Sequence, residues 1–127
     1  MTPEETVLDY YEALRRGEPL YSYFVERAET WKAAISTEYS GYDAVSEALR
    51  EQTRTTDEWT VESEALSVTE REGLALFDDA VRMAWTDTRT GQRHGFDSRW
   101  SGALEPVDGD DEEWGFVQMH VSAPRTL

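Results

Sequence analysis

The chain has 127 residues, of which 39% are hydrophobic and 12% aromatic, and we expect one folded domain over residues 1–127. Acidic residues outnumber basic ones by 27 to 12, a formal net charge of −15, which argues against a surface for DNA, RNA or anionic lipid. The absence of cysteine excludes disulfides, thiolate metal sites and a cysteine nucleophile. No apolar run is long enough to cross a membrane and residues 1–5 lack signal-peptide features, so we expect a cytoplasmic protein with no membrane partner.

The basic residues are divided unevenly, because eleven are arginines and only Lys32 is a lysine. A carboxylate-rich surface with almost no lysine is typical of proteins from halophiles. The alternative is an ordinary acidic protein from a GC-rich genome. In both cases most carboxylates are expected on the solvated surface.

The first helix has clear end signals. Thr2 can act as N-cap with Pro3 at the first helical position, and Glu5 completes a capping box. Gly17 can close the helix and Pro19 prevents its continuation.

Two further helices are predicted before the chain changes character. Residues 20–25 predict a brief helix, whereas residues 31–36 are compatible with either a strand or a helix. Gly41 opens a third helix, with Tyr42, Val45 and Leu49 on one face.

After residue 55 the patterns indicate strands. We expect them over residues 59–68, 74–87, 92–107 and 114–122, with a hairpin turn at 88–91 and an acidic turn at 108–113. Asp78 and Asp79 lie within the second of these strands and mark either a bulge or an exposed acidic edge. Helices followed by antiparallel strands indicate an α+β fold.

The last strand carries the first candidate site. Strict alternation places five residues on one face and grades it from apolar to polar: Trp114, Phe116, Gln118, His120 and Ser122. This grading is typical of a ligand cavity, and the alternative is a core face that grows polar toward the edge of the sheet.

The preceding strand places Asp97 and Arg99 on a common face. If that face is inward, Arg99 needs an anionic partner, which is either a ligand or Asp97. The alternative is a surface ion pair. No phosphate-binding loop is found, and His94 and His120 lack metal-ligand spacing, so we expect neither a metal nor a cofactor.

The C-terminal hairpin resembles that of the SnoaL-like domains of the nuclear transport factor 2-like superfamily. The resemblance rests on Arg99-Trp100, the acidic turn and the run WGFVQMHVSAP at residues 114–124. The association domain of calcium/calmodulin-dependent protein kinase II has a similar hairpin that ends His-x-His-x-Ser, and Gln118 replaces its first histidine. Residues 10–18 and 41–45 resemble the opening and third helices of the superfamily.

This resemblance implies a fold and a mode of assembly. The fold is a cone, in which a strongly curved antiparallel sheet wraps around three helices and leaves a pocket at one end. Members usually pair through the sheet, so a homodimer or larger homo-oligomer is expected.

The resemblance is less direct for mechanism. Tyr10 matches the helical tyrosine of the ketosteroid isomerases, but their general-base position falls on Lys32. Because a protonated lysine cannot abstract a proton, we do not favour the isomerase mechanism. SnoaL-type cyclases use a histidine and an aspartate, which implies catalytic roles for His120 and Asp97.

Two functions remain open. The first is a small-molecule protein for a hydrophobic ligand with a carbonyl or carboxylate group, with acid/base catalysis of the cyclase, isomerase or dehydratase type. The expected ligand-binding residues are Arg99, Gln118, Ser122, Tyr10, Trp31 and Trp85, with core packing as the alternative for the three aromatic residues. The second is a non-catalytic association module.

Overall fold

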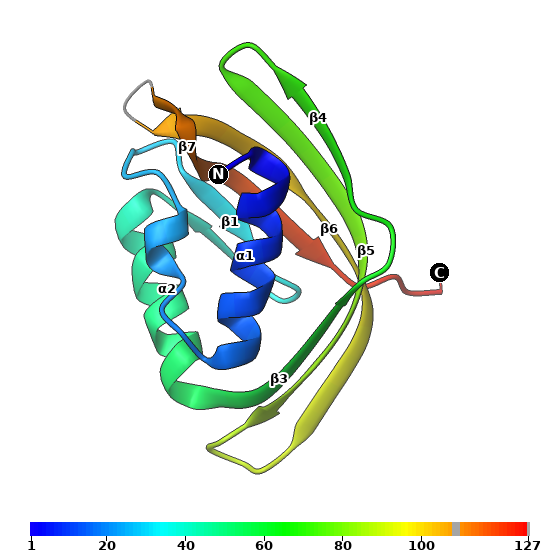
Figure 1. The fold of residues 1–127 in the computed structure, drawn as a ribbon. Helices are drawn as coiled ribbons and strands as arrows, with labels where there is room; N and C mark the ends of the chain where they lie inside the picture. The colour runs from blue at the N-terminus through cyan, green and yellow to red at the C-terminus, as the bar shows by residue number, and fades with distance from the viewer. Residues whose placement is uncertain (108–109, 127) are drawn as a thin grey trace.

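The computed structural model describes residues 1–107 and 110–126, and it is an α+β cone. Helix α1 (Pro3–Arg16), the 3₁₀-helix η1 (Tyr21–Tyr23) and helix α2 (Tyr42–Thr55) lie on the concave side of a curved seven-stranded sheet (Figure 1). The strands are β1 (Trp31–Ala33), β2 (Glu38–Ser40), β3 (Thr56–Ser63), β4 (Ser67–Arg71), β5 (Leu74–Asp87), β6 (Arg93–Val107) and β7 (Asp110–Ser122).

The ends of α1 confirm the sequence signals. The Thr2 hydroxyl accepts a hydrogen bond from the Glu5 amide at 3.1 Å, and the Glu5 carboxylate accepts one from the Thr2 amide at 2.8 Å. Gly17 ends the helix in the left-handed conformation, with φ of 68°. Among the described residues, no helix combines the length and the apolar character needed to span a membrane.

The second of the three expected helices is shorter than predicted. It is a single 3₁₀ turn, so the described part of the cone contains two α-helices and one such turn. The ambiguous residues 31–36 include a strand, β1, and the predicted strand over residues 59–68 is divided into β3 and β4. The turn predicted at 108–113 is shorter, because β7 begins at Asp110; residues 108 and 109 lie outside the described residues.

The sheet is mixed rather than entirely antiparallel. Its order is β2-β1-β7-β6-β5-β3, with β4 paired to β5. Only β1 and β7 run parallel among the described pairs. No hairpin joins these two strands, so no turn imposes an antiparallel direction on them.

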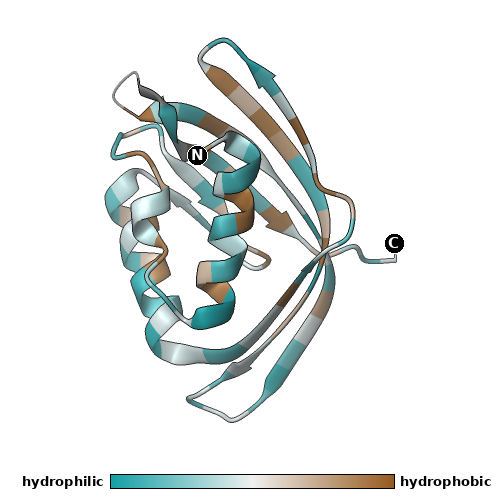
Figure 2. Cartoon of the chain, viewed as in Figure 1, coloured by the Kyte–Doolittle hydropathy of each residue, from teal (hydrophilic) through white to brown (hydrophobic). Residues whose placement is uncertain are grey.

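Aromatic packing between α1 and the sheet forms the core. Tyr10 contacts Phe116 with ring centroids 5.4 Å apart, and Tyr11 contacts Trp100 at 5.3 Å. Figure 2 shows the apolar side of α1 turned toward the strands. The conical sheet and the helix are therefore held together by edge-to-face ring contacts.

Asp79 corrects one expectation, because it is buried and lies in a regular part of β5. Its carboxylate accepts hydrogen bonds from the Tyr11 hydroxyl at 2.9 Å, the Ser63 hydroxyl at 2.6 Å and the Ala65 amide at 2.9 Å. Asp78 is exposed, as expected of an acidic strand edge. Three donors thus satisfy the hydrogen-bonding needs of the buried Asp79 carboxylate, and the bond from Tyr11 links α1 to the sheet.

A bulge in β7 overturns the predicted face of the last strand. Ala103 pairs with Gln118 but Leu104 pairs with Phe116, so Val117 is an extra residue. Phe116 is buried before the bulge, and Met119 is buried after it. Gln118, His120 and Ser122 therefore point away from the face that holds Trp114 and Phe116.

The bulge requires a glycine on the neighbouring strand. A β-carbon at Gly102 would overlap the backbone carbonyl oxygen of Gln118 and lie 2.9 Å from Cε1 of Phe77. At Gly95, on the same strand, the nearest atoms would be at an ordinary 3.8 Å.

We expect Gly102→Ala to lower the free energy of unfolding by about 1–3 kcal/mol, because the added methyl group displaces the bulged backbone. Gly95→Ala is the matched control and should change stability by less than about 0.5 kcal/mol. Chemical denaturation measures both values. Equal effects at the two positions would contradict the role given to the bulge.

Candidate functional site

A cavity of about 280 Å³ lies inside the cone, between the helices and the inner face of the sheet. Its apolar wall comes from α1, α2 and the strands, and consists of Tyr10, Leu14, Ala34, Ile35, Ala48, Leu49, Trp59, Met83, Trp85, Trp100 and Val121. The polar groups on the wall are Lys32, Ser36, Tyr39, Glu51, Gln52, Thr55, Thr56 and Arg89. The cavity is thus mainly apolar with a few converging polar groups, as ligand pockets are.

A second bulge builds the aromatic part of this wall. The register between β3 and β5 shifts between Asp57 and Thr60, and Glu58 has a positive φ of 54°. Trp59, beside it, stacks on Trp85 with ring centroids 4.8 Å apart, and its indole N–H donates to the Thr56 hydroxyl at 2.8 Å. The stacked pair makes this part of the cavity wall aromatic, and Trp85 is held in addition by contacts with His94 and Phe96.

Lys32, the only lysine of the chain, reaches this cavity from β1. It pairs in register with the buried Met119, so the two side chains lie on the inner face. The side chain is 6% exposed, and the structure shows no hydrogen bond or ion pair for it with any described residue. Since no fully enclosed side-chain nitrogen or oxygen of the described residues lacks a partner, the amine must be accessible from the cavity.

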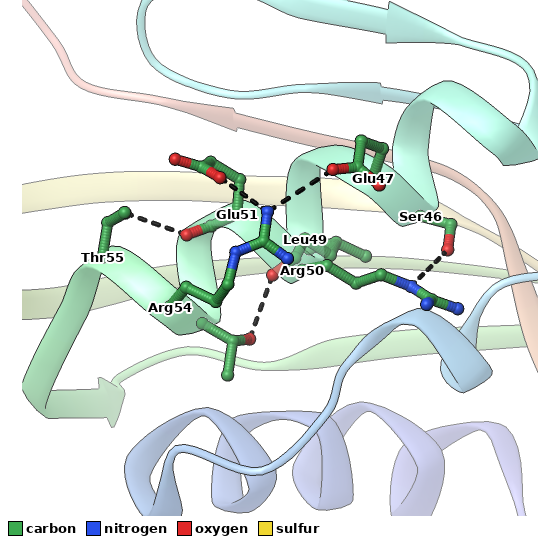
Figure 3. Close-up of polar contacts among 8 residues, drawn as sticks. Ser46, Glu47, Leu49, Arg50, Glu51, Arg54 and Thr55 are labelled. Atoms are coloured by element: carbon green, nitrogen blue, oxygen red, sulfur yellow. Dashed lines mark hydrogen bonds and ion pairs between the residues drawn. The ribbon is translucent and has the colours of Figure 1, made fainter.

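Burial lowers the pKa of Lys32 to about 8, because the apolar surroundings disfavour the charged ammonium. The other charged groups on the wall are paired elsewhere. The Glu51 carboxylate accepts from Arg54 at 2.7 Å (Figure 3), and Arg89 donates to Asp87 at 3.2 Å. The cavity therefore contains one amine whose charge no neighbouring carboxylate neutralises.

Tyr10 is a second titratable residue on the wall of the same cavity. It is buried, and burial raises the pKa of its phenol, so the hydroxyl stays protonated near neutral pH. No hydrogen bond of this hydroxyl is seen with any described residue.

Two of the residues predicted from the sequence, Tyr10 and Trp85, line the cavity. The other six do not: Trp31, Asp97, Arg99, Gln118, His120 and Ser122 lie on the outer face of the sheet. The bulge accounts for the last three. Asp97 and Arg99 alternate with the buried Ser98 and Trp100, and strand alternation alone could not say which of the two faces is inward.

The outer residues have their own contacts. Asp97 accepts a hydrogen bond from Arg82 at 3.1 Å rather than pairing with Arg99. His120 stacks on Trp31 with ring centroids 6.4 Å apart. The predicted pairing of His120 with Asp97 is absent from the described contacts.

Sequence reasoning passed over the most distinctive group of the cavity. From the sequence alone Lys32 is expected to be a protonated amine and therefore no base, and only its enclosure in the fold lowers its pKa. The available signal was its uniqueness in a chain with eleven arginines. No sequence pattern predicts that Trp59 and Gln52 line the cavity. An unpredicted bulge brings Trp59 to the wall, and the inner face of α2 brings Gln52 there.

Similar solved structures share this conical architecture. A ketosteroid isomerase-like protein from Erwinia carotovora superposes with a TM-score of 0.77 at 14% identity, covering 97% of this chain and 94% of that one. A proposed dehydratase of the nuclear transport factor 2-like family from Streptomyces avermitilis gives 0.82 at 15% identity, with 97% and 94% covered. A proposed calcium/calmodulin-dependent protein kinase type II association domain from Thiobacillus denitrificans gives 0.75 at 12% identity, with 98% and 96% covered.

These structures place the fold among the nuclear transport factor 2-like proteins. The SnoaL-like domain matches residues 4–126, so the chain belongs to the SnoaL-like domain family. No curated protein has a matching sequence. At such low identities the structural likeness establishes the fold, whereas function has to be argued from the cavity.

We expect Lys32→Met to stabilise the fold at pH 7 by up to about 3 kcal/mol, because it removes an amine whose protonation burial disfavours. The folded pKa lies below the ordinary value of 10.5, so between about pH 8 and 10.5 the unfolded chain binds more protons and wild-type stability rises with pH. The advantage of the variant should therefore shrink across this window.

Chemical denaturation at several pH values measures the difference in the free energy of unfolding between Lys32→Met and the wild type. The titration of groups that both proteins share, such as Tyr10, cancels in this difference. Arg99→Met is the control, because it removes an exposed cation and should show no such pH dependence. A constant difference between Lys32→Met and the wild type would rule out the lowered pKa.

Proposed function

We propose that the cone binds a small, mostly apolar ligand that carries a carboxylate or a carbonyl group, with that group against Lys32. The observation that carries this proposal is the enclosed amine without a protein partner in an aromatic cavity. An unpaired buried amine destabilises the fold, and a ligand oxygen would compensate it.

The size and wall of the cavity narrow the ligand class. Its volume of about 280 Å³ is near the lower limit of ordinary ligand pockets, which suits a ligand of one or two rings. Trp59 and Trp85 make one side of the wall aromatic, which suits a ligand that carries a ring. The net charge of −15 repels free anions, so an anionic ligand would depend on this local amine.

Any acid/base chemistry in the cavity would use Lys32 rather than His120. A group with a pKa near 8 exchanges protons efficiently close to neutral pH, and the Tyr10 hydroxyl can donate to a carbonyl oxygen. This arrangement suits proton transfer beside a carbonyl group, the chemistry that the isomerase-like and dehydratase names of similar structures suggest. His120 and Asp97 lie too far outside for this role, on the opposite face of the sheet.

We expect an aromatic carboxylate such as benzoate to raise the thermal midpoint by several degrees at about 100 times its dissociation constant, a gain of about 2.7 kcal/mol. Lys32→Met should weaken binding by about tenfold or more, because the ligand loses its charged partner. Arg99→Met, the outer-face control, should bind like the wild type. A loss of binding in Arg99→Met, with binding kept in Lys32→Met, would contradict the proposed site.

The outer face of the sheet favours a second role, association with another copy of the chain. The register places eight residues together at its centre, and only one of them is acidic despite the strongly acidic composition: Asp78, Ala80, Arg99, Ser101, Ala103, Gln118, His120 and Ser122. Trp31 adds a half-buried ring stacked on His120. A patch with a single carboxylate, Asp78, and the cationic Arg99 lets two like-charged subunits approach, so we propose a homodimer or larger homo-oligomer through this face.

We expect Ala80→Glu to convert the assembly to a 14.6 kDa monomer, because it places a bulky carboxylate at the centre of the patch. Ala44→Glu is the matched control, since Ala44 is exposed on α2, away from the sheet, and should leave the assembly intact. Light scattering after size-exclusion chromatography gives the masses. A monomeric wild-type protein at micromolar concentration would contradict this role.

A further inference from the structure

We propose that Lys32 is a nucleophile that captures an aldehyde or ketone in the cavity as an imine. This deepens the proposed ligand site and rests on it, since the same cavity must hold the carbonyl compound.

The amine is isolated in a way that favours its neutral, nucleophilic form. A carboxylate in contact would keep it protonated, and no described carboxylate forms an ion pair with it. The titratable or charged groups that share its cavity are Tyr10 from α1, Tyr39 from β2, Glu51 from α2 and Arg89 after β5. Glu51 and Arg89 are held by Arg54 and Asp87, respectively.

The wall favours a reaction with a ring-bearing carbonyl compound. Desolvation of a lysine in an apolar pocket is a recognised way of activating it toward carbonyl groups. The Trp59 and Trp85 rings make part of the same cavity wall aromatic, and Tyr10 is a protonated donor that can polarise a carbonyl oxygen. Burial lowers the pKa of Lys32 to about 8, so the free amine is available near neutral pH.

The reaction balances without any further reactant. The nitrogen lone pair attacks the carbonyl carbon and a carbon–nitrogen bond forms, giving a carbinolamine. The carbon–oxygen bond then breaks, the oxygen leaves as water with the two protons that the amine loses, and a carbon–nitrogen double bond remains. No oxidant, reductant or metal takes part.

The uniqueness of Lys32 makes the test direct. The full chain is incubated with benzaldehyde and sodium cyanoborohydride, which reduces an imine to a stable benzylamine that mass spectrometry detects. Apart from Lys32, the only primary amine in the sequence is the chain terminus at Met1, and peptide mapping separates the two. We expect Lys32 to be labelled about tenfold or more faster in the folded protein than in denaturant, with a rate that rises through about pH 8.

Competition and two variants separate this inference from simple binding. Benzoate, bound in the same cavity, should slow the labelling of Lys32 but not that of the terminus. Lys32→Met should lose the internal adduct and weaken benzoate binding, whereas Arg99→Met, on the outer face, should keep both.

Each failure has a distinct meaning. Benzoate binding without a Lys32 adduct would overturn the nucleophile and leave the proposed function standing. An adduct that benzoate does not slow would also overturn the inference, because the amine would then react outside the ligand site. The absence of both binding and adduct would refute the proposed function together with this inference.

Discussion

The bulge at Val117 determines which side chains of β7 reach the inside of the cone. It lets Phe116 pack against Tyr10 in the core and then returns Met119 and Val121 to the same inner face. Gly102 makes this possible, because any side chain there would collide with the Gln118 carbonyl oxygen. Because of the extra residue, Gln118, His120 and Ser122 point outward, and the polar end of β7 lies on the outer surface. The charged side chain inside the cone comes instead from β1, as Lys32.

The buried lysine and the acidic surface belong to one electrostatic arrangement. The carboxylates of this chain are mostly solvated, where water screens them, whereas Lys32 lies among aromatic and aliphatic groups. A charge in such surroundings is costly unless it is neutralised, either by losing its proton or by contacting an anion. Both responses are chemically useful, because the first yields a nucleophile or base and the second a ligand anchor.

The two proposed roles occupy opposite faces of the same sheet. Trp100 and Val121 turn inward to the cavity, while their neighbours Arg99 and Ser122 turn outward to the proposed association patch. Because adjacent residues of a strand serve different faces, ligand binding and assembly can be altered independently by single substitutions. The conical fold thus leaves room for both proposed roles on one chain.

Local signals in the sequence predicted most of the helices and strands, because they depend on residues close together in the chain. The Thr2 capping box, the Gly17 terminus, the helix after Gly41 and the long strand over residues 74–87 all lie where local patterns predict them. Tyr10 and Trp85 also line the cavity. The orientation of the other six predicted residues depended on long-range register, which a one-residue bulge inverts and which no local pattern encodes. The lowered pKa of Lys32 also depends on the tertiary structure alone, because the pKa of an amine is set by the groups that the whole fold places around it.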